Sequence, residues 1–137
     1  MHFNYQVEGG DFTRAGFASS EVKKVLKQLN VDPVKIKHIV VALYEAEVNI
    51  VAHAYRGKID VDIETDKVFV VLTDEGPGIP DIKLAMQEGY STASQKVREM
   101  GFGAGMGLPN IKKNSDLLNI QSEVGKGTKV EITTFLN

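Results

Sequence analysis

Three groups of residues in this chain have the chemistry needed to bind a nucleotide. An acid–amide pair, Glu45 and Asn49, lies four residues apart in a largely apolar stretch. Two glycine clusters follow at 74–79 and 101–108, about 25 residues apart. Together they suggest a carboxylate that reads a base, a glycine loop that binds phosphates and a metal ligand. The ordered set is far more specific than any one of its parts.

The acid–amide pair lies on a predicted helix that begins at Asp32-Pro33 and ends near Tyr55. Residues four apart on a helix share one face, so Glu45 and Asn49 should project together. Mg²⁺ bound to a triphosphate prefers oxygen ligands and few protein contacts, so Asn49 is the candidate metal ligand. Glu45 could orient a water or hydroxyl for attack and is the candidate catalytic residue. The alternative is that the pair only forms structural hydrogen bonds, which is the commoner role of an isolated pair.

Two histidines of the same predicted helix project near the acid–amide pair. His38 falls in the sector of Glu45, and His53 lies just beyond it. We include His53 among the candidate cofactor-binding residues, although a lone histidine such as His53 or His38 is more often a packing residue. Glu47 projects to nearly the opposite side and is not expected to be a ligand.

The first glycine cluster follows an apolar run at 68–72, which predicts a central strand. Asp74 at its end could accept a hydrogen bond from the exocyclic amino group of adenine, which guanine lacks at that ring position. Gly76 and Gly78 would allow the backbone to approach a flat base without a Cβ clash. Ile79 completes this candidate cofactor-binding group. A plain strand-ending turn is the alternative.

The second glycine cluster precedes a helical pattern. Successive glycines before a helix expose N–H groups to an anion, and the helix dipole adds to the attraction. No Gly-Lys-Ser/Thr follows, which excludes a P-loop, and no strand leads directly into the cluster, which excludes a Rossmann turn. A loose surface loop is the alternative. Thr128, after the turn at 125–127, could place a hydroxyl close to the base. The phosphate-binding candidates are Gly103, Ala104, Gly105, Met106, Gly107 and Leu108.

The elements that must position these groups follow the order β-α-α-β-β-α-loop-α-β-β. This order predicts an α+β fold, a two-layer sandwich with helices on one face of a mostly antiparallel mixed sheet. Asp11 is the expected N-cap of the first helix. The predicted strands are 2–8, 59–64, 68–72, 118–124 and 128–135, and the predicted helices are 12–29, 33–55, 81–88 and 108–116.

Composition narrows the function classes further. The 137 residues correspond to about one domain, with 42% hydrophobic and 25% charged residues. The absence of cysteine excludes disulfides and thiolate metal sites. A net charge of −2 without a basic block disfavours nucleic acid binding. There is neither a signal-peptide pattern nor an apolar run of membrane-spanning length, so we expect a cytoplasmic protein.

In this order, the motifs resemble those of the GHKL (Bergerat-fold) ATPases. Glu45-Ala-Glu-Val-Asn49 resembles the N box, and Asp74-Glu-Gly-Pro-Gly-Ile79 resembles the first glycine box. The stretches 103–108 and 125–128 resemble the second and final glycine boxes. The resemblance covers nearly the whole chain. It implies one ATP-binding domain over 1–137, with Mg-ATP between the N-box helix and a lid at about 89–107.

Within that superfamily, the length favours the free-standing bacterial serine kinases and anti-sigma factors. About ten residues precede the first predicted helix, which leaves no room for the dimerisation hairpin of a sensor histidine kinase. The segment 76–92 is especially similar to the switch kinase of the stressosome. The segment from Ala93 to Met100 is longer and more charged than expected for that kinase.

The resemblance implies an ATP-dependent serine/threonine-protein kinase that phosphorylates a STAS-type partner in partner-switching regulation. Glu45 would be the general base, Asn49 would hold Mg²⁺, and Asp74 and Thr128 would read adenine. One alternative is a binding module in which ATP holds the lid in a form that sequesters a sigma factor or activates a phosphatase. Another is a detached histidine-kinase-like ATPase domain. The expected partners are a STAS protein, a sigma factor or phosphatase and a second copy of the chain, with neither nucleic acid nor membrane.

Overall fold

Five strands form one antiparallel sheet in the computed structural model, which describes residues 1–87 and 107–137. The strand order is β1-β2-β3-β5-β4, so the chain places its last strand beside its third. The strands are β1 (His2–Glu8), β2 (Arg56–Ile63), β3 (Lys67–Glu75), β4 (Leu117–Glu123) and β5 (Gly127–Phe135).

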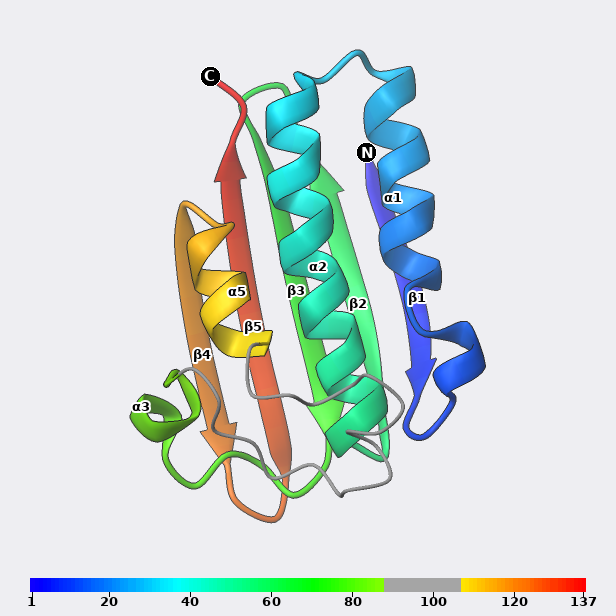
Figure 1. Ribbon diagram of the computed structural model, residues 1–137. Coiled ribbons are helices and arrows are strands. Elements are labelled where there is room, and N and C mark those ends of the chain that lie inside the picture. Colours follow the sequence, from blue (N-terminus) through cyan, green and yellow to red (C-terminus); the bar gives the residue numbers. More distant parts are fainter. Residues whose placement is uncertain (88–106) are drawn as a thin grey trace.

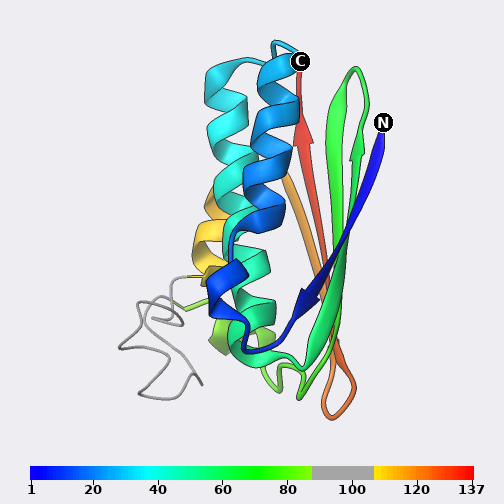
Figure 2. The same ribbon diagram turned by 90° about the vertical axis from the view of Figure 1, so that its right-hand side faces the viewer.

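Helices cover one face of this sheet, as Figures 1 and 2 show. Among residues 1–87 and 107–137, the helices are α1 (Phe17–Gln28), α2 (Pro33–His53), α3 (Ile82–Ala85) and α5 (Gly107–Lys113), with a 3-10 turn at Phe12–Arg14. The predicted α+β class with helices on one sheet face is therefore confirmed. In the part of the chain that the structure describes, no helix is both long and apolar enough to cross a bilayer.

The core lies between the helices and the sheet. Alternate residues of β2 are buried, with Ile59 and Val61 fully enclosed, while Asp60 is turned toward the uncovered face. Leu26 of α1 and Leu43 of α2 belong to the same core on the helical side of the sheet, and their side chains are also fully buried. Burial of such side chains is the main favourable term in folding, at about 1.5–3 kcal/mol each.

The start of α2 follows the predicted capping chemistry. The Asp32 carboxylate accepts a hydrogen bond from the Val34 backbone N–H at 3.2 Å, and Pro33 occupies the first turn. The helix ends at His53, two residues before the predicted end. Asp81 caps α3 in the same way, accepting from the Leu84 N–H at 3.1 Å.

The predicted start of the first helix is wrong. Asp11 makes no capping hydrogen bond to the backbone, and its carboxylate accepts instead from the Thr13 hydroxyl at 2.8 Å. The helix α1 begins only at Phe17, after Gly16 with φ +91°. Gly16 has no side chain with which to cap it, so the cap has to come from elsewhere in the chain.

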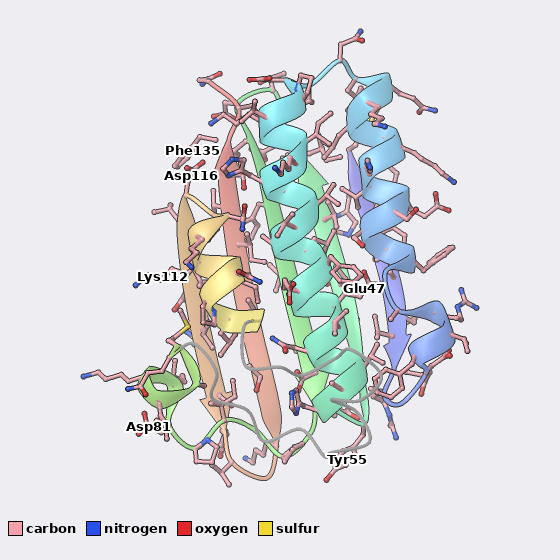
Figure 3. All side chains as sticks on the ribbon, in the orientation of Figure 1. Glu47, Tyr55, Asp81, Lys112, Asp116 and Phe135 are labelled. Atoms are coloured by element: carbon pink, nitrogen blue, oxygen red, sulfur yellow. The ribbon has the colours of Figure 1, made fainter. Side chains whose placement is uncertain are left out.

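That cap is Glu47, from the middle of α2 (Figure 3). Its two carboxylate oxygens accept from the backbone N–H groups of Ala18 at 3.0 Å and Ser19 at 3.1 Å. Glu47 is only 2% exposed. A negative charge at a helix N-terminus is favourable because the first N–H groups lack helical partners. Glu47 therefore has a structural role at the start of α1.

Other boundaries also differ from the prediction: β3 extends to Glu75, three residues past its predicted end, and α3 ends at Ala85, three residues before its predicted end. The strand β2 begins at Arg56, three residues earlier than predicted, and Gly57 pairs with Asp74 within the sheet. The helix α5 begins at Gly107, one residue before its predicted start, and ends at Lys113, three residues before its predicted end.

Candidate functional site

The C-terminal half of α2 carries the acid–amide pair toward the first turn of α5. Glu45 is half-buried, and burial raises the pKa of its carboxyl group above the ordinary value. A hydrogen bond with the Asn110 side chain opposes this shift by favouring the ionised form. Asn110 follows the second glycine cluster and was missed by the sequence analysis, because no local pattern links it to a residue 65 positions earlier.

Asn49 lies directly against the start of α5. A methyl group placed on Gly107 would lie 3.0 Å from the Asn49 Oδ1 and 3.2 Å from its Nδ2. Only a glycine allows this approach without displacing the amide. Leu108, the next residue, is buried in the core and holds this end of α5 in place. The structure therefore brings together Glu45, Asn49, Gly107 and Asn110 from two distant segments.

A second group forms at the end of β3. One Asp74 oxygen, Oδ1, accepts from the Thr128 backbone N–H at 3.1 Å. The Thr128 hydroxyl is 2.9 Å from the Ser122 hydroxyl. Burial raises the pKa of Asp74, and the Thr128 N–H opposes that shift. The predicted neighbours Asp74 and Thr128 are thus in direct contact.

The segment after Asp74 is fixed to the turn between β4 and β5. The Gly76 N–H donates to the Lys126 carbonyl at 3.0 Å, and the Pro77 carbonyl accepts from the Gly125 N–H at 2.9 Å. The Ile79 N–H donates to the Ser122 hydroxyl at 2.7 Å. These bonds make 76–79 a rigid edge of the site, although its residues belong to no helix or strand.

Gly78 shows why this segment needs glycine. Its φ is +76°, a conformation that side chains with a Cβ rarely adopt. A methyl group on Gly78 would also lie 2.5 Å from the Glu123 carbonyl oxygen. The glycine therefore lets the loop pack against β4.

The end of α2 joins the two groups. A methyl group on Gly76 would lie 3.0 Å from the Ala54 Cα, so the backbone after α2 touches the first glycine segment. His53 is half-buried beside it, and burial lowers the pKa of its imidazole below 6.5. His53 is therefore neutral at pH 7 and fits a packing or hydrogen-bonding role. His38 is exposed, so the packing interpretation fails for it.

Four of the predicted phosphate-binding residues cannot be placed. Gly103, Ala104, Gly105 and Met106 lie outside the described residues, together with the charged segment 93–100 and all of the predicted lid except Gly107. Among the candidates within 1–87 and 107–137, Glu45, Asn49, Gly107 and Leu108 gather at the α2–α5 contact. Asp74, Gly76, Gly78, Ile79 and Thr128 gather at the end of β3, and His53 is the last residue of α2, next to Ala54.

The comparison with protein families identifies the fold family. The histidine kinase-like ATPase domain matches residues 12–134, which include every element from the 3-10 turn to β5 except its last residue. The chain belongs to this family. The predicted superfamily is therefore confirmed, and the acid–amide helix and both glycine clusters lie within the matched residues.

Curated relatives of this ATPase-family chain are bacterial regulators. It is 31% identical over 118 residues to the serine/threonine-protein kinase RsbT of Bacillus subtilis, covering 83% of each chain. It is 34% identical over 125 residues to an anti-sigma F factor of Caldanaerobacter subterraneus, covering 88% of this chain and 84% of that one. These relatives match the predicted bacterial group and support its kinase class.

Solved structures agree on the fold. The RsbU and RsbW domains of a Mycobacterium tuberculosis protein align with a TM-score of 0.66 at 16% identity, covering 98% of this chain and 32% of that one. The mycobacterial sensor histidine kinase MprB aligns with a TM-score of 0.56 at 18% identity, covering 98% and 97%. At these identities the likeness concerns the fold alone.

Proposed function

We propose that this chain transfers the γ-phosphate of ATP to a serine or threonine hydroxyl of a STAS-type partner protein. The observation that carries the proposal is the placement of Glu45 and Asn49 side by side against the first turn of α5. A helix that presents a carboxylate and an amide to the end of a glycine cluster is suited to phosphoryl transfer. Such catalysis depends on positioning and charge stabilisation.

Glu45 is suited to the role of general base. A base acts best when its pKa lies near the working pH, and the burial of Glu45 moves its pKa upward from the ordinary carboxyl range. The Asn110 side chain limits that rise, because its hydrogen bond favours the ionised carboxylate. Glu45 would take the proton from the attacking hydroxyl as its oxygen bonds to the γ-phosphorus, while the bond from that phosphorus to the bridging oxygen breaks and ADP leaves with the electron pair.

Asn49 is suited to hold Mg²⁺ together with the nucleotide. In the part of the chain that the structure describes, no group of three or more acidic or histidine side chains could bind a metal by itself. Mg²⁺ commonly takes one or two protein oxygens, several waters and substrate phosphates. The Asn49 carbonyl beside Gly107 fits that pattern. When bound, Mg²⁺ would neutralise the charge of the triphosphate.

Asp74 is suited to read adenine. Its Oδ1 is occupied by the Thr128 N–H, and its Oδ2 would accept from the exocyclic amino group. The rigid segment 76–79 would lie along the base, and the Thr128 hydroxyl would stand beside it. The neutral His53 would contact the bound cofactor from α2.

The relatives support a regulatory protein as substrate. One is named a serine/threonine-protein kinase and another an anti-sigma F factor, which leaves two roles for the same site. The second candidate function is therefore ATP-dependent sequestration of a sigma factor, with phosphate transfer secondary. We also propose that the chain forms a homodimer and acts in the cytoplasm.

A transfer assay separates these roles. The purified chain is mixed with ³²P-labelled ATP, Mg²⁺ and each STAS-domain protein of the source genome, and label on the partner is measured after acid treatment. Acid-stable label on serine or threonine is expected. Acid-labile label would indicate a histidine acceptor and contradict the proposal. ATP-dependent binding of a sigma factor without any transfer would favour the sequestering role.

A further inference from the structure

A basic-edged apolar groove lies at the end of the helical layer away from the candidate site. It runs between the C-terminal half of α1 and the N-terminal half of α2, which lie side by side in Figure 1. Its volume is about 560 Å³, which is in the size range of pockets that take several side chains. The groove is lined by Lys23, Lys27, Asn30, Val31, Pro33, Ile36, Lys37, Val40 and Val41.

The charge of this groove has one sign. Lys23 and Lys27 stand on α1 and Lys37 stands on α2, so both walls are positive, and none of the nine lining residues is acidic. The segment 20–41 holds five lysines and only two acidic residues, although the whole chain is negative. Both acids are engaged elsewhere, since Asp32 caps α2 and Glu21 pairs with Lys24 at 3.7 Å.

The lysines at the rim form no ion pair within the described residues. Lys23 and Lys27 are four residues apart on α1, where like charges repel and weaken the helix. An acidic side chain of a partner, placed between Lys23 and Lys27, would attract both lysines and offset their mutual repulsion. The floor between the lysines is apolar, with Ile36 buried and Val40 and Val41 half-buried. The groove thus combines apolar pockets with a cationic rim.

We infer that this groove is the docking site for an acidic amphipathic helix of a partner protein. A helix can lay an apolar stripe at positions i, i+3 or i+4 and i+7 into a groove between two helices. Glutamates or aspartates that flank the stripe would meet the lysines on both walls. The groove lies on the N-terminal half of α2, from Pro33 to Val41, whereas Glu45 and Asn49 lie in its C-terminal half, so none of the groove residues belongs to the candidate site.

Selection from a displayed library of random helical peptides tests this inference on the full chain without nucleotide. We expect enriched peptides to carry an apolar stripe and an excess of acidic residues. The dissociation constant of the strongest peptide is then measured by fluorescence anisotropy. The double variant Lys27→Glu/Lys37→Glu should weaken it by about tenfold or more, since attraction becomes repulsion.

Lys58→Glu is the matched control. Lys58 is exposed on β2, and its neighbour Ile59 is buried under the helices, so Lys58 faces the opposite side of the sheet. Lys58→Glu changes the net charge as much as Lys27→Glu or Lys37→Glu alone does. It should bind the peptide as the unaltered chain does, whereas each of those two single variants should weaken binding. Equal melting temperatures of the variants show that exposed lysines were changed without loss of the fold.

Four results would overturn the inference. Enriched peptides without an excess of acidic residues would show that the lysines of the groove do not select the partner. Equal weakening by Lys58→Glu and the double variant would show only a general effect of net charge. Tight binding of laurate in the groove, with no peptide enriched, would indicate an anionic lipid instead of a helix. Replacement of the peptide's apolar stripe by alanine should also abolish binding, and retained binding would contradict the apolar floor's role.

Discussion

Removal of the Glu47 carboxylate should destabilise the protein more than any surface change. Glu47 is 2% exposed and supplies the hydrogen-bond acceptors for the first turn of α1. In Glu47→Ala, the N–H groups of Ala18 and Ser19 lose their acceptors inside a closed core. The first turn of α1 then has no cap, because Gly16 has no side chain with which to replace it.

The magnitude follows from those two hydrogen bonds. A buried donor left without a partner costs about 1–3 kcal/mol, so two cost about 2–6 kcal/mol. Typical domains have a free energy of unfolding of about 5–15 kcal/mol, so the loss is a large part of the total. Glu47→Gln keeps one good acceptor and places an amide N–H₂ against the other donor. It should lose roughly half as much as Glu47→Ala.

Urea unfolding followed by circular dichroism measures the effect. With a slope of about 1–3 kcal/mol per molar urea, Glu47→Ala should lower the midpoint by about 1 M or more. Glu21→Ala is the control, because Glu21 stands on the same helix in a surface pair with Lys24 and should cost about 0.5 kcal/mol or less. A Glu47→Ala midpoint equal to that of Glu21→Ala would refute the cap.

Three further predictions concern the site. Gly78→Ala should destabilise the fold by about 1–2 kcal/mol through its positive φ, with an added cost from the clash with the Glu123 carbonyl, and it should weaken ATP binding. The control is Gly125→Ala, because Gly125 has a φ of +83° and open space around it, so this variant should show only the conformational cost. Equal effects of the two variants on ATP affinity in calorimetry and on the melting temperature would contradict the packing role of Gly78. Asp74→Asn should weaken ATP binding by about 10–100-fold, as expected for loss of a hydrogen bond to a charged group; unchanged affinity in titration calorimetry would exclude the base-reading role. Asn110→Ala should raise the pKa of Glu45 further, because the hydrogen bond that favours the carboxylate is lost. Since the base must be ionised, the acid limb of the rate profile should move to higher pH, and an unmoved limb would argue against Glu45 as the titrating group.

Local signals predicted the fold where the interactions are local. Asp32-Pro33 sets the start of α2, and Asp81 sets the start of α3, through bonds to residues two or three positions away. The alternation of β2 predicted its buried face, because a strand presents successive side chains to opposite sides. The ordered motifs also predicted which residues would meet, since Asp74 and Thr128 are in contact although 54 positions apart.

Distant interactions account for what the sequence did not reveal. The start of α1 depends on Glu47, 28 or 29 positions away, whereas the sequence pattern indicated the nearby Asp11 as the N-cap. Gly57 resembles a helix terminator, yet it lies in β2, where a Cβ would be 3.0 Å from both the Ile50 side chain and the Thr73 carbonyl. The hydrogen bond between Asn110 and Glu45 depends on the packing of α5 against α2, which no local sequence pattern predicts.

The rate of phosphate transfer by Glu45→Gln tests the central claim most directly. The amide cannot accept the proton of the attacking hydroxyl, so transfer to the partner protein should fall by about 10²–10⁴-fold. ATP affinity should be preserved, and stability at pH 7 should not fall, because the glutamine removes a carboxylate whose burial is unfavourable. Transfer within about tenfold of the unaltered chain, with ATP bound equally well, would contradict the assignment of Glu45 as the base.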